Sequence, residues 1–224
     1  MRDFISWNEE MADKYNPESY YKNANFIIRY VENKRIRLVE RMLIASKRDR
    51  VLEVGCGAGN ILERIRRGRV IGIDISERML IRAKLRLSKN EDAILIRADA
   101  ERLPFYDKLF DKVIASEVLE HTEHPEIVLL EIGRVVKNGG TLLITIPNEP
   151  LINDIKKILD RIGIFNLCFK GIPKAMDEEW HLHSFHLGML KRMIPSNFKI
   201  QKVRAVPFWF LPLRFCVLLS VNLQ

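Results

Sequence analysis

Residues 52–60 read LEVGCGAGN, and this stretch decides the fold. It follows an apolar run over residues 50–54 and precedes a helical pattern over 61–67, so the glycines occupy a turn between a strand and a helix. Glycine lets the backbone turn sharply and approach a ligand closely, and the N-terminus of the next helix points to the same place. The loop has Asn60 where a dinucleotide fingerprint needs glycine, and it lacks the Lys-Ser/Thr pair of a phosphate-binding P-loop.

Strand and helix patterns continue to alternate after this loop. Short apolar runs are separated by stretches whose apolar residues recur every three or four positions. This alternation is typical of the α/β class and predicts a Rossmann-like, doubly wound, mostly parallel sheet. Two late runs, 198–206 and 214–221, are joined by PFWFLP and predict an antiparallel C-terminal hairpin that completes seven strands. The five runs that predict parallel strands are 50–54, 69–74, 93–98, 110–116 and 140–146.

The length of 224 residues suits one hydrophobic core, so we expect a single domain over residues 1–224. It divides into an N-terminal helical segment (1–47), a cofactor-binding core (48–148), a substrate-side insertion (149–182), and a C-terminal helix with the hairpin (183–224).

Composition excludes several classes of protein. Apolar residues make up 47% and charged residues 29%, which excludes a disordered or fibrous chain. The N-terminus has no apolar signal-peptide region, and the apolar stretch 205–221 is interrupted by two prolines and an arginine, so we expect no transmembrane segment. No CxxC pair is present, so we expect no disulfide framework, no zinc site and a cytoplasmic location; the cysteines are Cys56, Cys168 and Cys216.

Polar side chains recur where the predicted strands end. Asp74 ends the second strand nineteen residues after Gly55, where a carboxylate can accept hydrogen bonds from both hydroxyls of a ribose. Asp99 follows the third strand, and Ser116 ends the fourth. Open α/β sheets bind ligands at this edge, so the sequence predicts a nucleoside-binding crevice there.

With these motifs the chain resembles the class I S-adenosylmethionine-dependent methyltransferases, and among them the small-molecule enzymes of ubiquinone and menaquinone biosynthesis. The resemblance runs from about Arg50 to Asn148. It rests on LEVGCGAGN, GIDIS and ADAERLPF, and on two later segments, FDKVIASEVLEH and LLEIGRVVKNGGTLLITIPN.

The resemblance implies S-adenosylmethionine as cofactor and gives each matching residue a role. The three loop glycines would line its methionine and ribose part, Glu53 would hold the ammonium group, and Asp74 the ribose hydroxyls. Asp99 and the Ala100 backbone would contact adenine, with Ile75 on the ring face. An arginine at the place of Arg35 binds the cofactor carboxylate in the ubiquinone-type enzymes. The implied cofactor-binding set is Arg35, Glu53, Gly55, Cys56, Gly57, Gly59, Asp74, Ile75, Asp99, Ala100 and Ser116.

The segment after the fourth strand offers groups for catalysis. Glu117, Glu120 and His121 are spaced i, i+3 and i+4, so their side chains share one face if the segment is helical. Either His121 acts as general base toward a hydroxyl, or the three residues bind a divalent cation such as magnesium that lowers the pKa of that hydroxyl. A third alternative is structural, because acids in helical turns also cap helices or pair with arginine.

This ExxEH pattern resembles the metal site of ubiquinone-biosynthesis O-methyltransferases and that of small-RNA 3′-terminal ribose methyltransferases. The RNA enzymes add a further histidine from downstream. Here residues 180–186 read WHLHSFH, and His181 is the best match in position, which makes it a second candidate catalytic residue.

The net charge of +8 lies in two segments, 34–50 and 61–69. Two interpretations are open: these segments form a basic surface that attracts polyanions, or they form solvated helix faces with no partner. We expect transfer of a methyl group to a hydroxyl of a small acceptor, of the hydrophobic kind that a quinone precursor or a lipid represents. The apolar insertion is also compatible with peripheral membrane contact. RNA is the alternative substrate and nucleic acid the alternative partner, and a cofactor-binding module without catalysis is a third interpretation.

Overall fold

A sheet of seven strands, in the order β3-β2-β1-β4-β5-β7-β6, forms the centre of the molecule in the residues that the structure describes, 3–15, 26–88, 92–165 and 179–222. The structure is a computed structural model. β1 to β5 run parallel, whereas β7 is antiparallel to both β5 and β6. The predicted fold is thereby confirmed. The strands are β1 (Arg50–Val54), β2 (Arg69–Asp74), β3 (Ile94–Arg97), β4 (Phe110–Ser116), β5 (Val136–Pro147), β6 (Phe198–Phe208) and β7 (Leu211–Val221).

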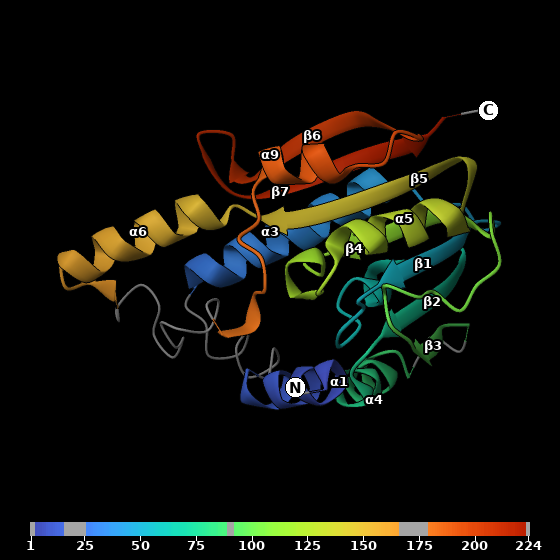
Figure 1. Cartoon of the computed structure of the whole chain (residues 1–224), viewed down its shortest axis with the longest axis horizontal. Helices are drawn as coiled ribbons and strands as arrows, with labels where there is room; N and C mark the ends of the chain where they lie inside the picture. Colours follow the sequence, from blue (N-terminus) through green and yellow to red (C-terminus); the bar gives the residue numbers. More distant parts are fainter. Residues whose placement is uncertain (1–2, 16–25, 89–91, 166–178, 223–224) are drawn as a thin grey trace.

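Helices cover both faces of the sheet (Figure 1). Alternate strand residues point to opposite faces, as the period of a strand requires. Leu52 and Val113 join the core beneath α5 and α9, while Val51 and Ile114 join the core beneath α3. The described helices are α1 (Phe4–Lys14), α3 (Phe26–Leu43), α4 (Glu77–Arg86), α5 (Pro125–Val135), α6 (Glu149–Arg161) and α9 (Leu187–Met193), with 3₁₀ turns η1 (Leu62–Arg64) and η2 (Leu119–His121).

Two local expectations are wrong. The helical pattern over 61–67 forms only the turn η1, because β2 begins at Arg69 and the short connection already extends at Ile65. The hairpin strands are longer than predicted and leave only Trp209 and Phe210 between them. Residues 166–178 of the expected insertion, Cys168 included, lie outside the described part of the chain.

The carboxyl ends of β1, β2, β4 and β5 meet at one edge of the sheet, as their parallel pairing requires. α6 leaves this edge directly after β5 and extends away from the sheet (Figure 1). Across the described ranges, no helix combines the length and the apolar character needed to cross a membrane.

Candidate active site

The glycine loop turns between the end of β1 and η1. Gly55 has φ +66°, and a Cβ added there would lie 2.3 Å from Cγ2 of Val118, so no other residue fits. Gly57 has φ +50° and donates its backbone N–H to Oδ2 of Asp74 at 2.7 Å, which joins the ends of β1 and β2. No atom lies within 4 Å of a Cβ built on Gly57, so the loop is open on that side.

A cavity of about 500 Å³ opens beside this loop. All but one of the residues that the sequence predicts for the site line it. The exception is Gly59, whose added Cβ would lie 3.3 Å from Cβ of Ala83, so this glycine allows close packing on α4. The roles of the predicted site residues toward a cofactor stay predictions. The predicted residues that line the cavity are Arg35, Glu53, Gly55, Cys56, Gly57, Asp74, Ile75, Asp99, Ala100, Ser116, Glu117, Glu120, His121 and His181.

Two carboxylates at the strand ends have perturbed acidity. Burial raises the pKa of Glu53 well above its usual value, and the charge of Arg35 lowers it only in part. Oε2 of Glu53 has no hydrogen-bond partner among the described residues, so the cavity holds a carboxylate oxygen suited to an ammonium group. Burial also raises the pKa of Asp74 to about 6, although the backbone N–H groups of Ser76 and Gly57 oppose the shift.

A buried ion-pair chain supports the cavity wall between α3 and the strand ends. Nε and Nη2 of Arg35 donate to Glu32 at 3.0 and 2.9 Å, and Arg35 also donates to the hydroxyl of Ser116. Glu32 pairs in turn with Arg214 of β7 at 2.7 Å, and Arg214 pairs with Glu117 at 2.8 Å. Because paired charges can remain buried, these ion pairs hold in place the side chains that line the cavity.

Glu117 therefore does not share a face with Glu120 and His121, contrary to the expected helical spacing. Its backbone has φ +52°, and only residues 119–121 form a short 3₁₀ turn. The Glu117 carboxylate faces Arg214 and accepts a hydrogen bond from Thr145 at 2.9 Å.

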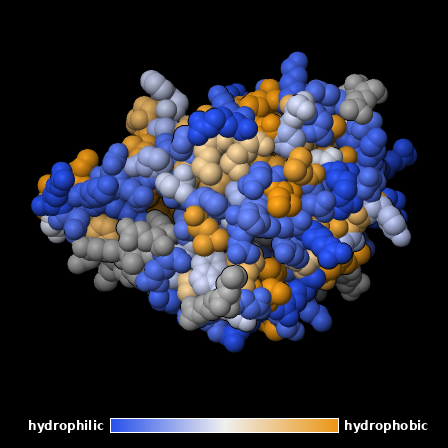
Figure 2. Space-filling view, in the orientation of Figure 1, coloured by the Kyte–Doolittle hydropathy of each residue, from blue (hydrophilic) through white to orange (hydrophobic). Residues whose placement is uncertain are grey.

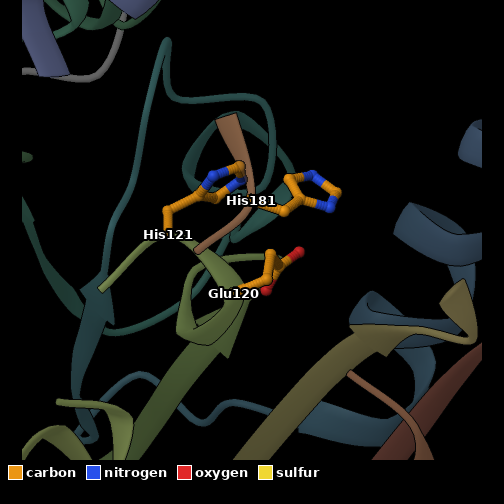
Figure 3. A group of neighbouring side chains, drawn as sticks. All are labelled: Glu120, His121 and His181. Atoms are coloured by element: carbon orange, nitrogen blue, oxygen red, sulfur yellow. The ribbon is translucent and has the colours of Figure 1, made fainter. Parts of the chain in front are cut away.

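The structure instead groups Glu120, His121 and His181 (Figure 3), with one potential ligand atom of each within 4.8 Å of the others. Glu120 is 1% exposed, and its Oε2 has no hydrogen-bond partner among the described residues. Burial and the neighbouring charge of Glu117 raise the pKa of Glu120 to about 8. The two imidazole rings lie edge to face with centroids 4.8 Å apart.

Both histidines are oriented through Nδ1. That of His121 donates to the Trp180 carbonyl at 3.1 Å, and that of His181 donates to Oε1 of Glu149 at 2.8 Å. With the proton on Nδ1, the lone pair of each neutral ring is on Nε2, which is the nitrogen that would accept a proton or ligate a cation. A hydrogen bond of 2.8 Å from the Leu182 N–H to the Glu120 carbonyl holds the two segments together.

Sequence reasoning missed Glu149, which is buried and lines the cavity directly after β5. The strand-end rule that selected Asp74 also selects this position, two residues after Pro147. Glu32 and Arg214 were missed as well, and no local pattern distinguishes them from other charged residues.

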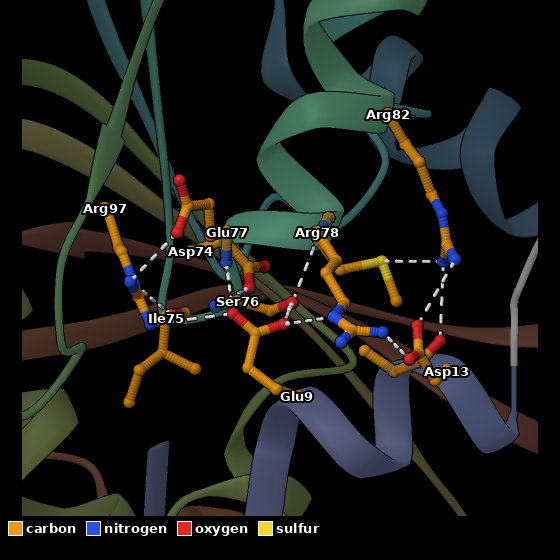
Figure 4. Close-up of polar contacts among 11 residues, drawn as sticks. Glu9, Asp13, Asp74, Ile75, Ser76, Glu77, Arg78, Arg82 and Arg97 are labelled. Atoms are coloured by element: carbon orange, nitrogen blue, oxygen red, sulfur yellow. Dashed lines mark hydrogen bonds and ion pairs between the residues drawn. The ribbon is translucent and has the colours of Figure 1, made fainter. Parts of the chain in front are cut away.

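Helix α1 and the residue that follows it close another side of the cavity, through Phe4, Asn8, Ala12 and Tyr15. Figure 4 shows Glu9 of α1 directed at the start of α4, where its carboxylate accepts from the Ser76 hydroxyl at 2.8 Å and the Glu77 N–H at 2.7 Å. A carboxylate is favoured at a helix N-terminus.

The remaining wall of the cavity is apolar. It combines the start of α3, one side of α6 and the start of β7, and its members are Ile27, Ile28, Val31, Ile152, Ile155, Leu159, Leu211 and Leu213. This wall and the polar strand ends together suit a ligand pair, one polar and one largely apolar.

Comparison with known proteins identifies the family. Residues 52–144 match the model of the methyltransferase domain. An uncharacterized protein of Methanocaldococcus jannaschii, MJ1252, is 35% identical over 76% of this chain; the chain covers 65% of that relative, slightly less than two thirds of its length. The ubiquinone/menaquinone biosynthesis C-methyltransferase UbiE of Wigglesworthia glossinidia brevipalpis is 27% identical over 88% of this chain and 81% of its own. The crystal structure of PH0226 from Pyrococcus horikoshii superposes with a TM-score of 0.63 at 25% identity, covering 85% of this chain and 91% of that one.

The chain belongs to the class I S-adenosylmethionine-dependent methyltransferases. The comparisons place it among enzymes that use S-adenosylmethionine as methyl donor.

Proposed function

We propose that the enzyme methylates a small apolar acceptor at an ionisable hydroxyl or at the ring carbon beside it, with His181 as general base. The observation that carries this proposal is that the Glu149–His181 pair lines the same cavity as the glycine loop and the apolar wall. A base there meets the reacting group of an acceptor whose apolar part lies against α3 and α6.

The strand ends fit the polar donor. Asp74 presents a carboxylate to ribose hydroxyls, Glu53 offers an unpartnered buried oxygen to an ammonium group, and the open side of Gly57 admits close approach. Arg35 would face the donor carboxylate. S-adenosylmethionine supplies a methyl group on a positively charged sulfur, which leaves as the neutral thioether.

The protein's part in the chemistry is alignment and removal of one proton. Nε2 of His181 accepts the proton of the acceptor hydroxyl as the new bond to the methyl carbon forms and the bond from that carbon to sulfur breaks. The Glu149 carboxylate holds the ring through Nδ1 and stabilises the imidazolium. Ionising an aromatic hydroxyl activates both its oxygen and the adjacent ring carbons, and the C-methyltransferase name of the UbiE relative is compatible with the second site. At a ring carbon, the methylated ring then loses the proton of that carbon and its oxygen is protonated again, which restores the aromatic phenol.

A divalent cation held by Glu120, His121 and His181 is the second candidate for activating the hydroxyl. It is favoured by the unpartnered buried oxygen of Glu120 and by the outer hydrogen bonds that fix both rings. A metal-bound histidine usually has such a partner on its other nitrogen. A cation there would orient the hydroxyl and lower its pKa.

The cavity favours a small acceptor over RNA. Its lining cations are Arg35, Lys156 and Arg214 among the described residues, and the two arginines already pair with Glu32. RNA binding instead requires a continuous basic track toward the reacting group.

The test measures S-adenosylhomocysteine formation with a series of apolar phenols, using the wild-type enzyme and His181→Ala. We expect turnover with phenols. Methyl ethers of these phenols should give no turnover when the ring carbons beside the oxygen are also blocked. The His181→Ala variant should lose turnover with the phenols while it still binds the donor. Equal turnover in both enzymes would contradict the assignment of the base. Chelator-sensitive turnover restored by Mg²⁺ or Mn²⁺ would support the cation.

A further inference from the structure

The hairpin turn at the end of β6 exposes three consecutive aromatic side chains. Trp209 is 85% exposed and Phe210 66% exposed, and Phe208 precedes them; we call residues 208–210 the aromatic turn. Phe208 and Phe210 stack with centroids 5.2 Å apart, and Trp209 lies edge to face with Phe210. Single exposed apolar residues are ordinary on a protein surface, whereas a contiguous exposed cluster of this kind marks an interaction site.

The aromatic turn continues onto α3. The Tyr30 ring lies 6.3 Å from that of Phe208, and Tyr30 is itself half exposed. Figure 1 shows the turn, the start of α3 and α6 at the same end of the molecule, and Figure 2 shows apolar side chains exposed near the turn at the upper left. One end of the protein therefore carries Trp, Tyr and Phe side chains together.

A basic groove adjoins this aromatic group. It runs between α3 and β6, and Nζ of Lys34 lies 4.4 Å from the Phe208 ring centroid. No carboxylate is among the described residues that line it, which are Tyr30, Lys34, Arg37, Leu38, Arg41, Arg204, Ala205 and Val206. Tryptophan and tyrosine favour the membrane–water interface, and lysine and arginine favour anionic head groups beside it.

The lining of the cavity extends to the same end. Ile27 both lines the cavity and is half exposed near Tyr30, and Leu211, the residue after the aromatic turn, lines it too. An apolar compound dissolved in a bilayer thus meets the cavity wall beside the residues that would touch the membrane.

We propose that the aromatic turn and the basic groove dock the enzyme on the surface of an anionic phospholipid bilayer, from which the apolar acceptor enters the cavity. The acceptor part of this proposal rests on the proposed function, whereas the docking part does not. The aromatic side chains insert at the level of the head groups, and the groove cations lie over the lipid phosphates.

The test is co-sedimentation with vesicles of phosphatidylcholine alone or mixed with phosphatidylglycerol, without methyl donor or acceptor. We expect binding to the anionic vesicles only, weaker at high salt, with a blue shift of tryptophan emission that is lost in Trp209→Phe. The double variant W209S/F210S and the double variant R37E/R41E should each lower the partition coefficient about tenfold or more.

Matched controls lie away from this end. Tyr106→Ser removes an exposed aromatic residue that precedes β4 at the opposite edge of the sheet, and Lys84→Glu reverses an exposed charge on α4. Both should sediment as wild type.

Absence of binding to anionic vesicles would overturn the proposal, as would unchanged binding in W209S/F210S. Binding of RNA through Arg37 and Arg41, or a dimer that depends on Trp209 in the absence of lipid, would replace the bilayer as partner and equally overturn it. Because these measurements involve no methyl transfer, their failure leaves the proposed chemistry intact. Conversely, lack of turnover on a detergent-dispersed phenol counts against the proposed function alone.

Discussion

The carboxylate of Glu149 lies 2.8 Å from Nδ1 of His181, and the two residues are 32 positions apart in the chain. Glu149 follows β5 directly, whereas His181 comes from the segment before α9. Their pairing places an oriented imidazole at the edge of the sheet where the glycine loop and the acidic strand ends also lie.

Replacing His181 by alanine should lower kcat about 10²–10⁴-fold, because the proton acceptor is lost, while donor affinity stays unchanged. Glu149→Gln should lower kcat less, since the ring remains but its orientation and its imidazolium lose support. Steady-state kinetics with calorimetry of donor binding separate the two effects. His183→Ala is the matched control, because His183 faces the carbonyl of Thr122 at 3.0 Å and does not line the cavity. A kcat equally low in H183A would point to a structural effect of the segment.

Donor affinity should fall as the pH drops through about 6, the pKa of Asp74. Ribose hydroxyls donate hydrogen bonds, so they favour the ionised carboxylate, and each pH unit below the pKa should weaken binding about tenfold. Titration calorimetry across this range checks the slope. Asp74→Asn should bind about 1–3 kcal/mol more weakly above the pKa and show no such slope. A slope that persists in D74N would assign the titration to Glu53, whose charge interacts with Asp74.

Glu120→Gln should stabilise the metal-free protein at alkaline pH. The pKa of Glu120 is raised from 4.5 to about 8 in the folded state, so the free energy of unfolding falls as the pH rises between these values and the buried group is driven to ionise. Glutamine cannot ionise, so the variant should match the wild type near pH 4.5 and exceed its melting temperature above pH 8.

The same pair of proteins tests the cation. If Glu120, His121 and His181 bind one, adding Mg²⁺, Mn²⁺ or Zn²⁺ should raise the melting temperature of the wild type but not that of E120Q. Identical responses in both proteins would assign any shift to binding elsewhere.

Glu9→Ala should loosen α1 and weaken donor binding, because the Ser76 hydroxyl and the Glu77 N–H lose their acceptor. We expect faster hydrogen exchange over residues 3–15 and a donor affinity about tenfold lower. Ser6→Ala is the control on the same helix, since its hydroxyl reaches only Asp3 in the described contacts and is exposed. Unchanged exchange in E9A would show that apolar contacts alone hold the helix.

The fold was predictable from local patterns. The glycine loop and the alternating apolar runs each specify their own strand or turn, and the strand-end rule then brings Gly57 and Asp74 together. The structure confirms that proximity through a direct hydrogen bond.

The acceptor side was less predictable because it depends on distant contacts. The expectation that Glu117, Glu120 and His121 share one face depends on a helix. The backbone of Glu117 instead has a positive φ, and its side chain pairs with Arg214, nearly one hundred positions away in the sequence. The Glu149–His181 and Glu9–Ser76 contacts likewise join segments that no local periodicity relates.

The most direct test of the proposed function follows a labelled methyl group from S-adenosylmethionine into a fractionated cell extract. The wild-type enzyme should transfer label to small, organic-soluble compounds, and H181A should transfer almost none while still binding the donor. Label that enters RNA or protein instead, or enters organic-soluble compounds equally with H181A, would contradict the proposed acceptor or the proposed base.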